Sequence, residues 1–143
     1  MKEVLRGFTK NRASTDPGAS DPRLRGRTYT IPFEDVWQAS ISLCEGGLRG
    51  WGIVMADDQA GGIDGLYRTP IIGLEVDVWI QVGLDEDAQT RVDVQAASRT
   101  ERTDLGLTKR TIARFFRRLE KKLDVRPSQI LNPTTRATWQ EPT

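Results

Sequence analysis

The clearest pattern in the chain is a strict alternation of apolar and polar residues in two runs, 74–84 and 90–99. The apolar face of the first run comprises Leu74, Val76, Val78, Ile80, Val82 and Leu84, and the other face carries Glu75, Asp77, Trp79 and Gln81. The second run repeats the alternation with Val92, Val94 and Ala96 on its apolar face. A period of two predicts two strands, each with one face in the core.

Three shorter runs also favour strands, and they are "RTYTI" (27–31), "GWGIVMA" (50–56) and "GIDGLYRT" (62–69). The turn-rich "DDQAGG" separates the last two, and the polar "DEDAQ" separates the two long runs. Because consecutive strands joined by short loops pair with each other, residues 50–99 are predicted to form an antiparallel meander.

Two other segments follow the period of a helix. In residues 32–47 the apolar stripe comprises Val36, Trp37, Ser40, Ile41 and Cys44. In the last helix, which ends near residue 124, the apolar face comprises Ile112, Phe115, Phe116, Leu119 and Leu123, and basic residues cover the rest. Each stripe predicts an amphipathic helix with one face in the core. Thr108 is predicted to cap the start of the last helix, because its hydroxyl can accept a backbone N–H bond.

The order of these elements is β-α-β-β-β-β-α. Two amphipathic helices on one face of an antiparallel sheet would bury both apolar stripes, so the sequence predicts an α+β, helix-grip-like fold. We expect an extended N-terminal arm over residues 1–26, a single α+β domain over 27–124, and an irregular C-terminal tail over 125–143. Both flanking segments are rich in Pro and polar residues, which favour irregular chain.

The composition excludes several kinds of catalytic and metal-binding site. The chain has no His, and Cys44 is its only Cys, so His-assisted catalysis and Cys-based or His-based metal sites are excluded. The outward carboxylates Glu75, Asp77 and Asp93 lack a diagnostic spacing, and we interpret them as cross-strand partners of Arg68 and Arg91. We therefore expect no enzyme activity, no catalytic residue, no metal and no cofactor.

The charge is unevenly distributed, although the formal net charge is only +1. Residues 34–93 carry twelve acidic and three basic groups, whereas residues 109–126 carry eight basic and two acidic groups. The basic helix face is compatible with an acidic partner or with peripheral contact to an anionic membrane surface. We expect no nucleic-acid binding, because the net charge is low and no recognised motif is present.

Several segments resemble the domain of unknown function 1499 family: "LRGRTYTIPFEDVW", "GLRGWGIVMADDQAGGI", "VDVWIQVGLDEDAQTRVDVQAASR" and "DLGLTKRTIARF". The resemblance runs from about residue 11 to residue 123. It implies a fold and a sequence signature, and it implies no reaction. Two positions depart from the family pattern: Gln95 stands where the family tends to have Arg, and Thr108 where it tends to have Asn.

The core of this signature comprises Asp77, Ser98, Arg99 and Asp104. One interpretation is an anion-binding site, in which Arg99 binds a carboxylate or phosphate. The other is a structural latch, in which Arg99 pairs with Asp104 across the loop or with Asp77 across the sheet. The latch is favoured, because ion-pair networks produce such clusters without any chemistry.

Four residues are candidates for partner docking: Trp79, Trp139, Arg114 and Arg118. Trp79 lies on the polar side of its strand and Trp139 in a Pro-bounded tail, where an aromatic ring can anchor an interface. The alternative for both rings is packing against the chain itself, and for the arginines it is a solvated face.

The leading hypothesis is a non-catalytic interaction module, a small accessory or stabilising subunit. It would dock onto a larger protein assembly, membrane-bound assemblies included, through its N-terminal arm, its C-terminal tail and the face of its sheet. The alternative is a carrier of a small anionic or lipid-like ligand, with a cavity between the sheet and the last helix. A cytoplasmic location, peripheral to a membrane complex or free of one, is expected because no apolar run approaches the roughly 20 residues that span a bilayer.

Overall fold

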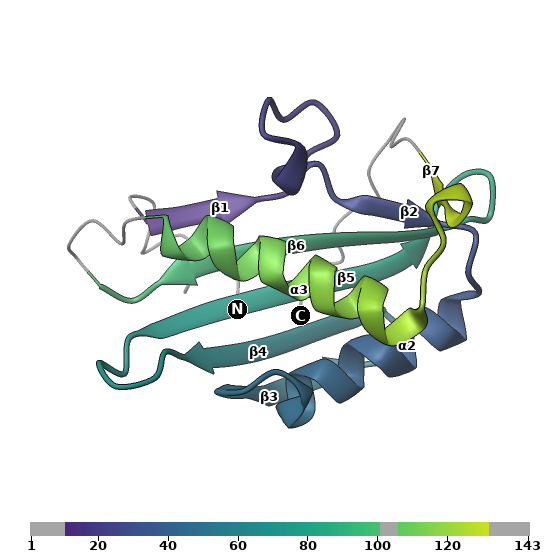
Figure 1. Cartoon of the computed structure of the whole chain (residues 1–143). Helices are drawn as coiled ribbons and strands as arrows, with labels where there is room; N and C mark the ends of the chain where they lie inside the picture. The colour runs from purple at the N-terminus through teal and green to yellow at the C-terminus, as the bar shows by residue number, and fades with distance from the viewer. Residues whose placement is uncertain (1–10, 101–105, 132–143) are drawn as a thin grey trace.

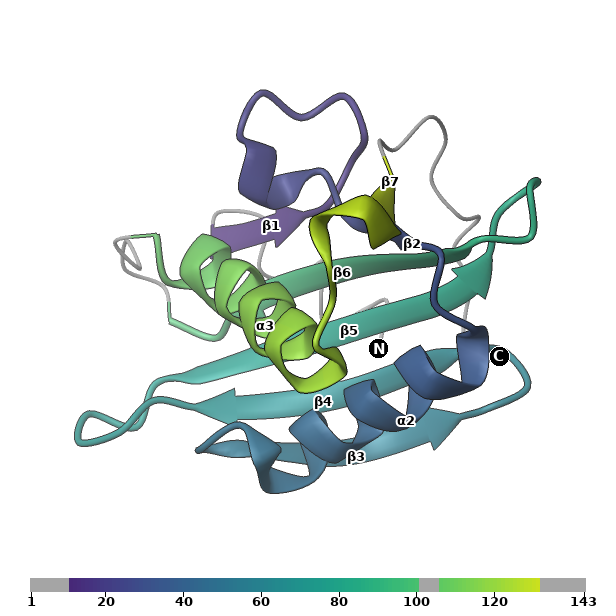
Figure 2. The same ribbon diagram turned by 45° about the vertical axis from the view of Figure 1, so that its right-hand side comes forward.

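The computed structural model describes residues 11–100 and 106–131, and Figure 1 shows the whole chain as a ribbon. Its centre is a seven-stranded sheet in which every pairing is antiparallel. The strands are β1 (Arg12–Ser14), β2 (Arg27–Tyr29), β3 (Trp51–Asp57), β4 (Gly62–Arg68), β5 (Glu75–Leu84), β6 (Thr90–Ser98) and β7 (Ile130–Leu131). The helices α2 (Phe33–Ser42) and α3 (Leu107–Leu123) both cover one face of the sheet (Figures 1 and 2). The predicted α+β fold is confirmed.

The four central strands form the predicted meander β3-β4-β5-β6. Asp57 closes the β3–β4 turn, where its Oδ1 accepts a hydrogen bond from the backbone N–H of Gln59 at 3.0 Å. Asp85 closes the β5–β6 turn in the same way, through the backbone N–H of Gln89 at 2.9 Å. Aspartate favours such turns because its short side chain can bond the backbone a few residues further on. Both turns lie at the same end of the sheet, since alternate connections of a meander share an end.

The far edge of the sheet is built from segments that are distant in sequence. β1 and β2 both pair with β6, with Arg12 opposite Ala97 and Thr28 opposite Arg91. β7 then pairs with β2, with Leu131 opposite Thr28. Short 3-10 helices, η2 (Pro22–Leu24) and η4 (Pro127–Gln129), lead into β2 and β7. The sheet therefore takes one strand from each of the two segments predicted as arm and tail.

The core lies between the sheet and the two helices. Val36 of α2 and Ile112, Phe115 and Leu119 of α3 are fully buried, as their periodicity predicts. The ring of Trp51 on β3 lies 6.0 Å from the ring of Phe115, measured between centroids. Full burial of one such side chain contributes about 1.5–3 kcal/mol, so these residues stabilise the packing of both helices on the sheet.

The segment predicted as one helix, residues 32–47, is divided in two. α2 ends at Ser42, and a π-helical turn, η3 (Leu43–Gly47), continues it. Gly46 has φ 123°, a conformation that glycine adopts far more readily than other residues. This glycine ends the helical path and turns the chain toward β3.

Thr108 is not the N-cap of α3. The helix begins at Leu107, and Gly106 occupies the N-cap position with φ 80°. Thr108 is therefore already inside the first turn and is buried. A glycine can take this left-handed conformation without the Cβ clash that a threonine would meet, so the chain enters the helix two residues earlier than predicted.

The outward face of the long strands also differs from the prediction. Asp77, Trp79 and Gln81 are buried rather than solvated, whereas Leu84, predicted to face the core, is exposed. Gly62 on β4 leaves room for the indole of Trp79, because a Cβ there would lie 2.8 Å from Trp79 Cη2. Alternation identifies the residues that share a face of a strand, but it does not reveal whether that face meets water.

Candidate functional site

The signature residues Arg99 and Asp77 form a bidentate ion pair across β5 and β6. Arg99 Nε and Nη2 each donate to one carboxylate oxygen of Asp77, both at 2.8 Å. The Arg99 backbone N–H also donates to the Glu75 carbonyl oxygen at 2.9 Å, which fixes the arginine at the end of β6. The hydrogen bond to Asp77 raises the pKa of Arg99 above its ordinary value. Of the two partners predicted for Arg99, the structure places Asp77 beside it.

The pair extends into a chain of charges along the end of the sheet. Glu75 lies 3.6 Å from Arg99 Nη1, and its other oxygen accepts a hydrogen bond from Arg68 Nη2 at 3.0 Å. Ser98 is buried, and its Oγ accepts a bond from the Thr100 backbone N–H at 3.3 Å. Asp104 lies outside the described residues. Because Asp77 already occupies two donors of Arg99, this geometry favours a latch over an anion site.

A second Arg–Asp pair lies under the N-terminal segment, and it is completely buried. Arg91 Nη2 and Asp93 Oδ1 are 2.9 Å apart, and both side chains are 0% exposed. The Thr15 hydroxyl donates to Asp93 Oδ1 at 2.7 Å, and Arg91 Nη2 also donates to the Arg25 carbonyl oxygen at 2.7 Å. The hydrogen bonds tie the segment between β1 and β2 to β6.

Gly26 is required beside this buried pair. A Cβ at residue 26 would lie 2.3 Å from Arg91 Nη2, and Gly26 has φ 74°. Arg91 and Asp93 are two residues apart on one strand, and they form an ion pair with each other rather than with a charged residue on another strand. Arg91 Nη1 also donates a hydrogen bond to Thr28 Oγ1 on β2 at 3.4 Å. Both charges are evident in the sequence, but their burial was not predicted. The Arg-x-Asp spacing in β6 is the only signal that places the two side chains on one face.

The helix α3 borders a groove of about 390 Å³, here called the arginine groove. Its lining residues are Arg23, Tyr67, Leu107, Arg110, Thr111, Ala113, Arg114 and Arg117. Arg23 reaches it from η2, where Asp21 pairs with it at 2.9 Å, and this hydrogen bond lowers the pKa of Asp21 to about 2. Within residues 11–100 and 106–131, Arg114 and Arg117 have no ion-pair partner.

A smaller groove of about 170 Å³ continues along the same helix and shares Arg23, Ala113 and Arg117 with the first. Its one carboxylate, Glu120, is already engaged. It accepts hydrogen bonds from Arg27 Nε at 3.0 Å and from the Tyr29 hydroxyl at 2.8 Å. The acid therefore belongs to the packing of α3 on β2 and does not neutralise the arginine groove.

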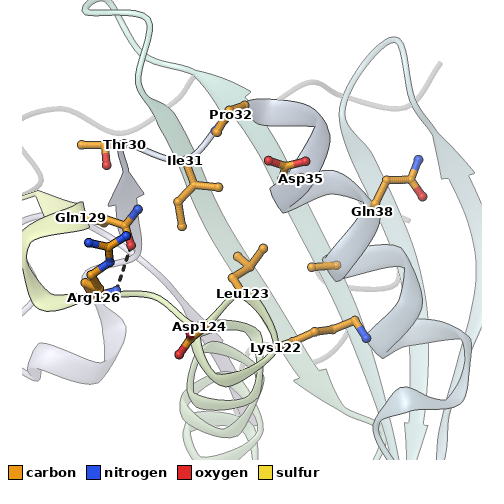
Figure 3. A pocket seen from close by; sticks show the side chains of 11 residues that line it. Thr30, Ile31, Pro32, Asp35, Gln38, Lys122, Leu123, Asp124, Arg126 and Gln129 are labelled. Atoms are coloured by element: carbon orange, nitrogen blue, oxygen red, sulfur yellow. Dashed lines mark hydrogen bonds between the residues drawn. The ribbon is translucent and has the colours of Figure 1, made fainter.

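A larger groove of about 750 Å³ lies between the start of α2, the end of α3 and η4 (Figure 3). Its lining residues include Asp35, Lys122, Asp124 and Arg126, so acids and bases are mixed around it. Gln129 accepts a hydrogen bond from the Arg126 backbone N–H at 2.9 Å, which the dashed line in Figure 3 marks. This balance of charge gives the groove no preference for one sign of ligand.

The remaining candidates fall outside these sites. Cys44 is buried, and burial raises the pKa of its thiol to about 12, so the thiolate nucleophile is scarce at neutral pH. Trp79 is buried, Trp139 lies outside the described residues, and Arg118 is half-buried on α3 and is not among the residues that line the arginine groove. No cluster of metal-ligating side chains and no helix of membrane-spanning length and hydropathy occur in the described ranges.

These observations define an α+β domain with an antiparallel sheet, two covering helices and a basic groove along the second helix. Residues 8–119 match the model of the family described as "Protein of unknown function (DUF1499)", which is more than half of the chain. The chain belongs to this family, which confirms the resemblance seen in its signature segments. A comparison with curated proteins finds no match.

Proposed function

We propose that this protein is a non-catalytic interaction module, an accessory subunit that docks onto a larger protein assembly by binding an acidic segment of its partner. The observation that supports this proposal is the arginine groove: four of its eight lining residues are arginines, and none is acidic. Guanidinium groups are well suited to this role, because their planar fork binds carboxylates through two parallel hydrogen bonds.

Repulsion between the arginines of α3 destabilises the helix in the unbound protein. Arg114 and Arg117 are three residues apart on α3. Neighbouring like charges on a helix destabilise it by about 0.2–0.5 kcal/mol per pair. An anionic ligand would turn this repulsion into attraction. A groove that concentrates such a cost is therefore better explained by an external anion than by the stability of the fold.

The groove favours a few carboxylates over a long polyanion. Its volume of about 390 Å³ suits one or two acidic side chains. Tyr67 and Leu107 add an apolar floor, and Tyr is among the residues that anchor protein interfaces. A nucleic acid would extend beyond the groove, and a formal net charge of only +1 does not favour binding of a long polyanion. An acidic protein segment with an apolar neighbour is the better match.

The alternative of a ligand carrier receives no comparable support. The space between α3 and the sheet is occupied by aromatic rings: Trp51 stacks on Phe115 at 6.0 Å and on Tyr67 at 5.7 Å. Phe115 also contacts Phe116 edge to face, at 5.7 Å. This packing gives the carrier alternative less support than the arginine groove gives the interaction module.

The test is a titration of a fluorescently labelled peptide of alternating Glu and Leu residues, followed by anisotropy. Wild type is compared with Arg114→Glu/Arg117→Glu and with the matched control Lys121→Glu/Lys122→Glu, which makes the same charge change on the same helix outside the arginine groove. We expect the groove variant to lose at least about tenfold in affinity, as one charge-assisted contact is worth about that factor. The control is expected to change by less than threefold.

Three outcomes would contradict the proposal. The peptide fails to bind wild type, both variants weaken binding equally, or a single-stranded oligonucleotide binds the groove more tightly than the peptide does. Affinity capture from the native host with the same three proteins then tests the docking itself. A true partner is retained by wild type and by the control variant, and is lost with the groove variant.

A further inference from the structure

Two adjacent isoleucines are highly exposed at the tip of the β4–β5 connection. Ile71 is 103% exposed and Ile72 is 77% exposed. The connection projects beyond the end of the sheet in both views (Figures 1 and 2). Single exposed apolar residues are common on protein surfaces, but two neighbouring large ones at a projecting tip favour a surface that receives them.

The turn holds these side chains in place at a conformational cost. Ile71 has φ 68°, a left-handed conformation that β-branched residues rarely adopt. Thr69 closes the loop on both sides: its N–H donates to the Leu74 carbonyl oxygen at 2.9 Å, and its hydroxyl accepts from the Leu74 N–H at 2.9 Å. A glycine at residue 71 would fit the turn better, so stability of the fold does not explain the isoleucine.

Cations surround this end of the sheet. Arg68 ends β4 and Arg99 follows β6, and each holds a carboxylate of β5 in an ion pair. Arg49, which precedes β3, and Lys109, in the first turn of α3, are both exposed. Glu45 on η3 is an exposed acid at the same end. Arg49 and Lys109 therefore outnumber Glu45 among these exposed charges, and this end of the sheet is basic.

The opposite end of the sheet has two acidic turns, and their acids outnumber the cations Lys121, Lys122 and Arg126 at the end of α3. The β3–β4 turn carries Asp57 and Asp58, and the β5–β6 turn carries Asp85, Glu86 and Asp87. The molecule is thus polarised along its strands, with the isoleucine tip at the basic end. An anionic surface would attract that end and repel the other, which presents the tip to the surface.

We propose that the isoleucine tip, Ile71 and Ile72, inserts into the headgroup region of an anionic membrane while the surrounding cations contact the lipid phosphates. A stable protein interface buries about 800 Å² and 20–30 residues on each side, which a narrow hairpin tip does not offer. A lipid surface needs no complementary pocket and accepts a convex apolar tip. The proposal is independent of the arginine groove, and either can fail without the other.

The test is flotation of the full-length protein with vesicles of phosphatidylglycerol and phosphatidylcholine, and with vesicles of phosphatidylcholine alone. Wild type is compared with Ile71→Ser/Ile72→Ser. The matched control is Val54→Ser/Met55→Ser, which removes two other exposed apolar side chains, 64% and 51% exposed, from β3. We expect binding to the anionic vesicles, a loss of about tenfold or more in the tip variant, and less than a twofold change in the control.

A second pair of variants separates charge from apolar contact. Arg49→Glu, at the basic end, is expected to weaken binding several-fold, and Arg126→Glu, beyond the far end of α3, is expected to leave it unchanged. Ile71→Gly relieves the left-handed strain, so it should raise the melting temperature while lowering vesicle binding. The proposal is overturned if wild type binds neither vesicle, if the tip variant binds as well as wild type, or if the tip instead drives self-association in light scattering.

Discussion

Two arginine–aspartate pairs of this fold have nearly the same geometry and opposite surroundings. Arg91 and Asp93 are 2.9 Å apart, and both are 0% exposed. Arg99 and Asp77 are 2.8 Å apart, but the arginine is 42% exposed. The distance between the charges therefore does not distinguish the two pairs. Their exposure to solvent does.

Burial changes the consequence of losing one partner. A buried ion pair is expensive to desolvate, and it is tolerated when further hydrogen bonds satisfy both groups. Thr15 and the Arg25 carbonyl supply such bonds to the Arg91–Asp93 pair. At the Arg99–Asp77 pair the arginine lies partly at the surface, so its removal would let water reach the Asp77 carboxylate. We therefore expect the buried pair to support the fold strongly and the exposed pair more weakly.

The largest effect is expected from Asp93→Asn. The amide keeps the shape of the carboxylate but leaves the charge of Arg91 buried without a counter-ion. Breaking a buried pair in this way costs about 3–5 kcal/mol of unfolding free energy. Urea unfolding followed by tryptophan fluorescence measures the loss.

A double variant provides the control for this substitution. Replacing both charges, as in Arg91→Met/Asp93→Leu, should recover much of the loss, because no uncompensated charge remains. Gly26→Ala should also destabilise, since its methyl group would lie 2.3 Å from Arg91 Nη2. If Asp93→Asn costs no more than the change at Arg99 described next, the contrast between the two pairs is wrong.

A smaller loss is expected from Arg99→Ala. It leaves Asp77, which is 6% exposed at its side chain, without its bidentate partner. We expect the free energy of unfolding to fall by about 1–2 kcal/mol. The loss should be smaller at high salt, because salt weakens the ion pair in wild type. Arg99→Lys should recover only part of it, because an ammonium cannot reproduce the two parallel bonds. Unchanged stability together with lost binding of an anion would instead favour the anion-site interpretation.

The smallest effect is expected from Asp64→Asn, on the strand beside the exposed pair. Burial raises the pKa of Asp64, and the charge of Asp77 raises it further. A raised folded pKa means that the protonated form stabilises the fold, and that this contribution is lost as the pH rises above the ordinary value of 3.8. The neutral amide should therefore raise the melting temperature at pH 7. The expected gain in the free energy of unfolding is less than about 1 kcal/mol. At pH 3 the variant and wild type should melt alike, and a loss of stability at pH 7 would contradict the expectation.

Local periodicity was sufficient to predict the meander and both helices. The alternation from Val76 to Val82 and the helical spacing of Ile112, Phe115 and Leu119 each repeat several times, so a single irregular residue does not obscure them. β1 and β7 lack this support. With three and two residues they are too short to show a period, and partners far along the chain determine their conformation.

The candidate sites were predictable in part. The signature identified Arg99 with Asp77 as a possible partner, because their strands were recognisable and adjacent. The burial of Arg91 and Asp93 depends on a loop that folds back from the N-terminal segment, and Arg23 joins Arg114 and Arg117 only once η2 lies beside α3. When a site is assembled from distant segments, no single segment carries a sequence pattern that identifies it.

The pairing of the N-terminal strands with β6 also constrains how the protein is made. Arg12 pairs with Ala97 and Thr28 with Arg91, so these early segments emerge from the ribosome long before their partner strand exists. Long-range pairings of this kind form late, since the loop must close before any contact rewards it. The meander and its helices can assemble first, and the N-terminal strands then complete the sheet edge. During synthesis, β1 and β2 therefore remain unpaired until β6 has been made.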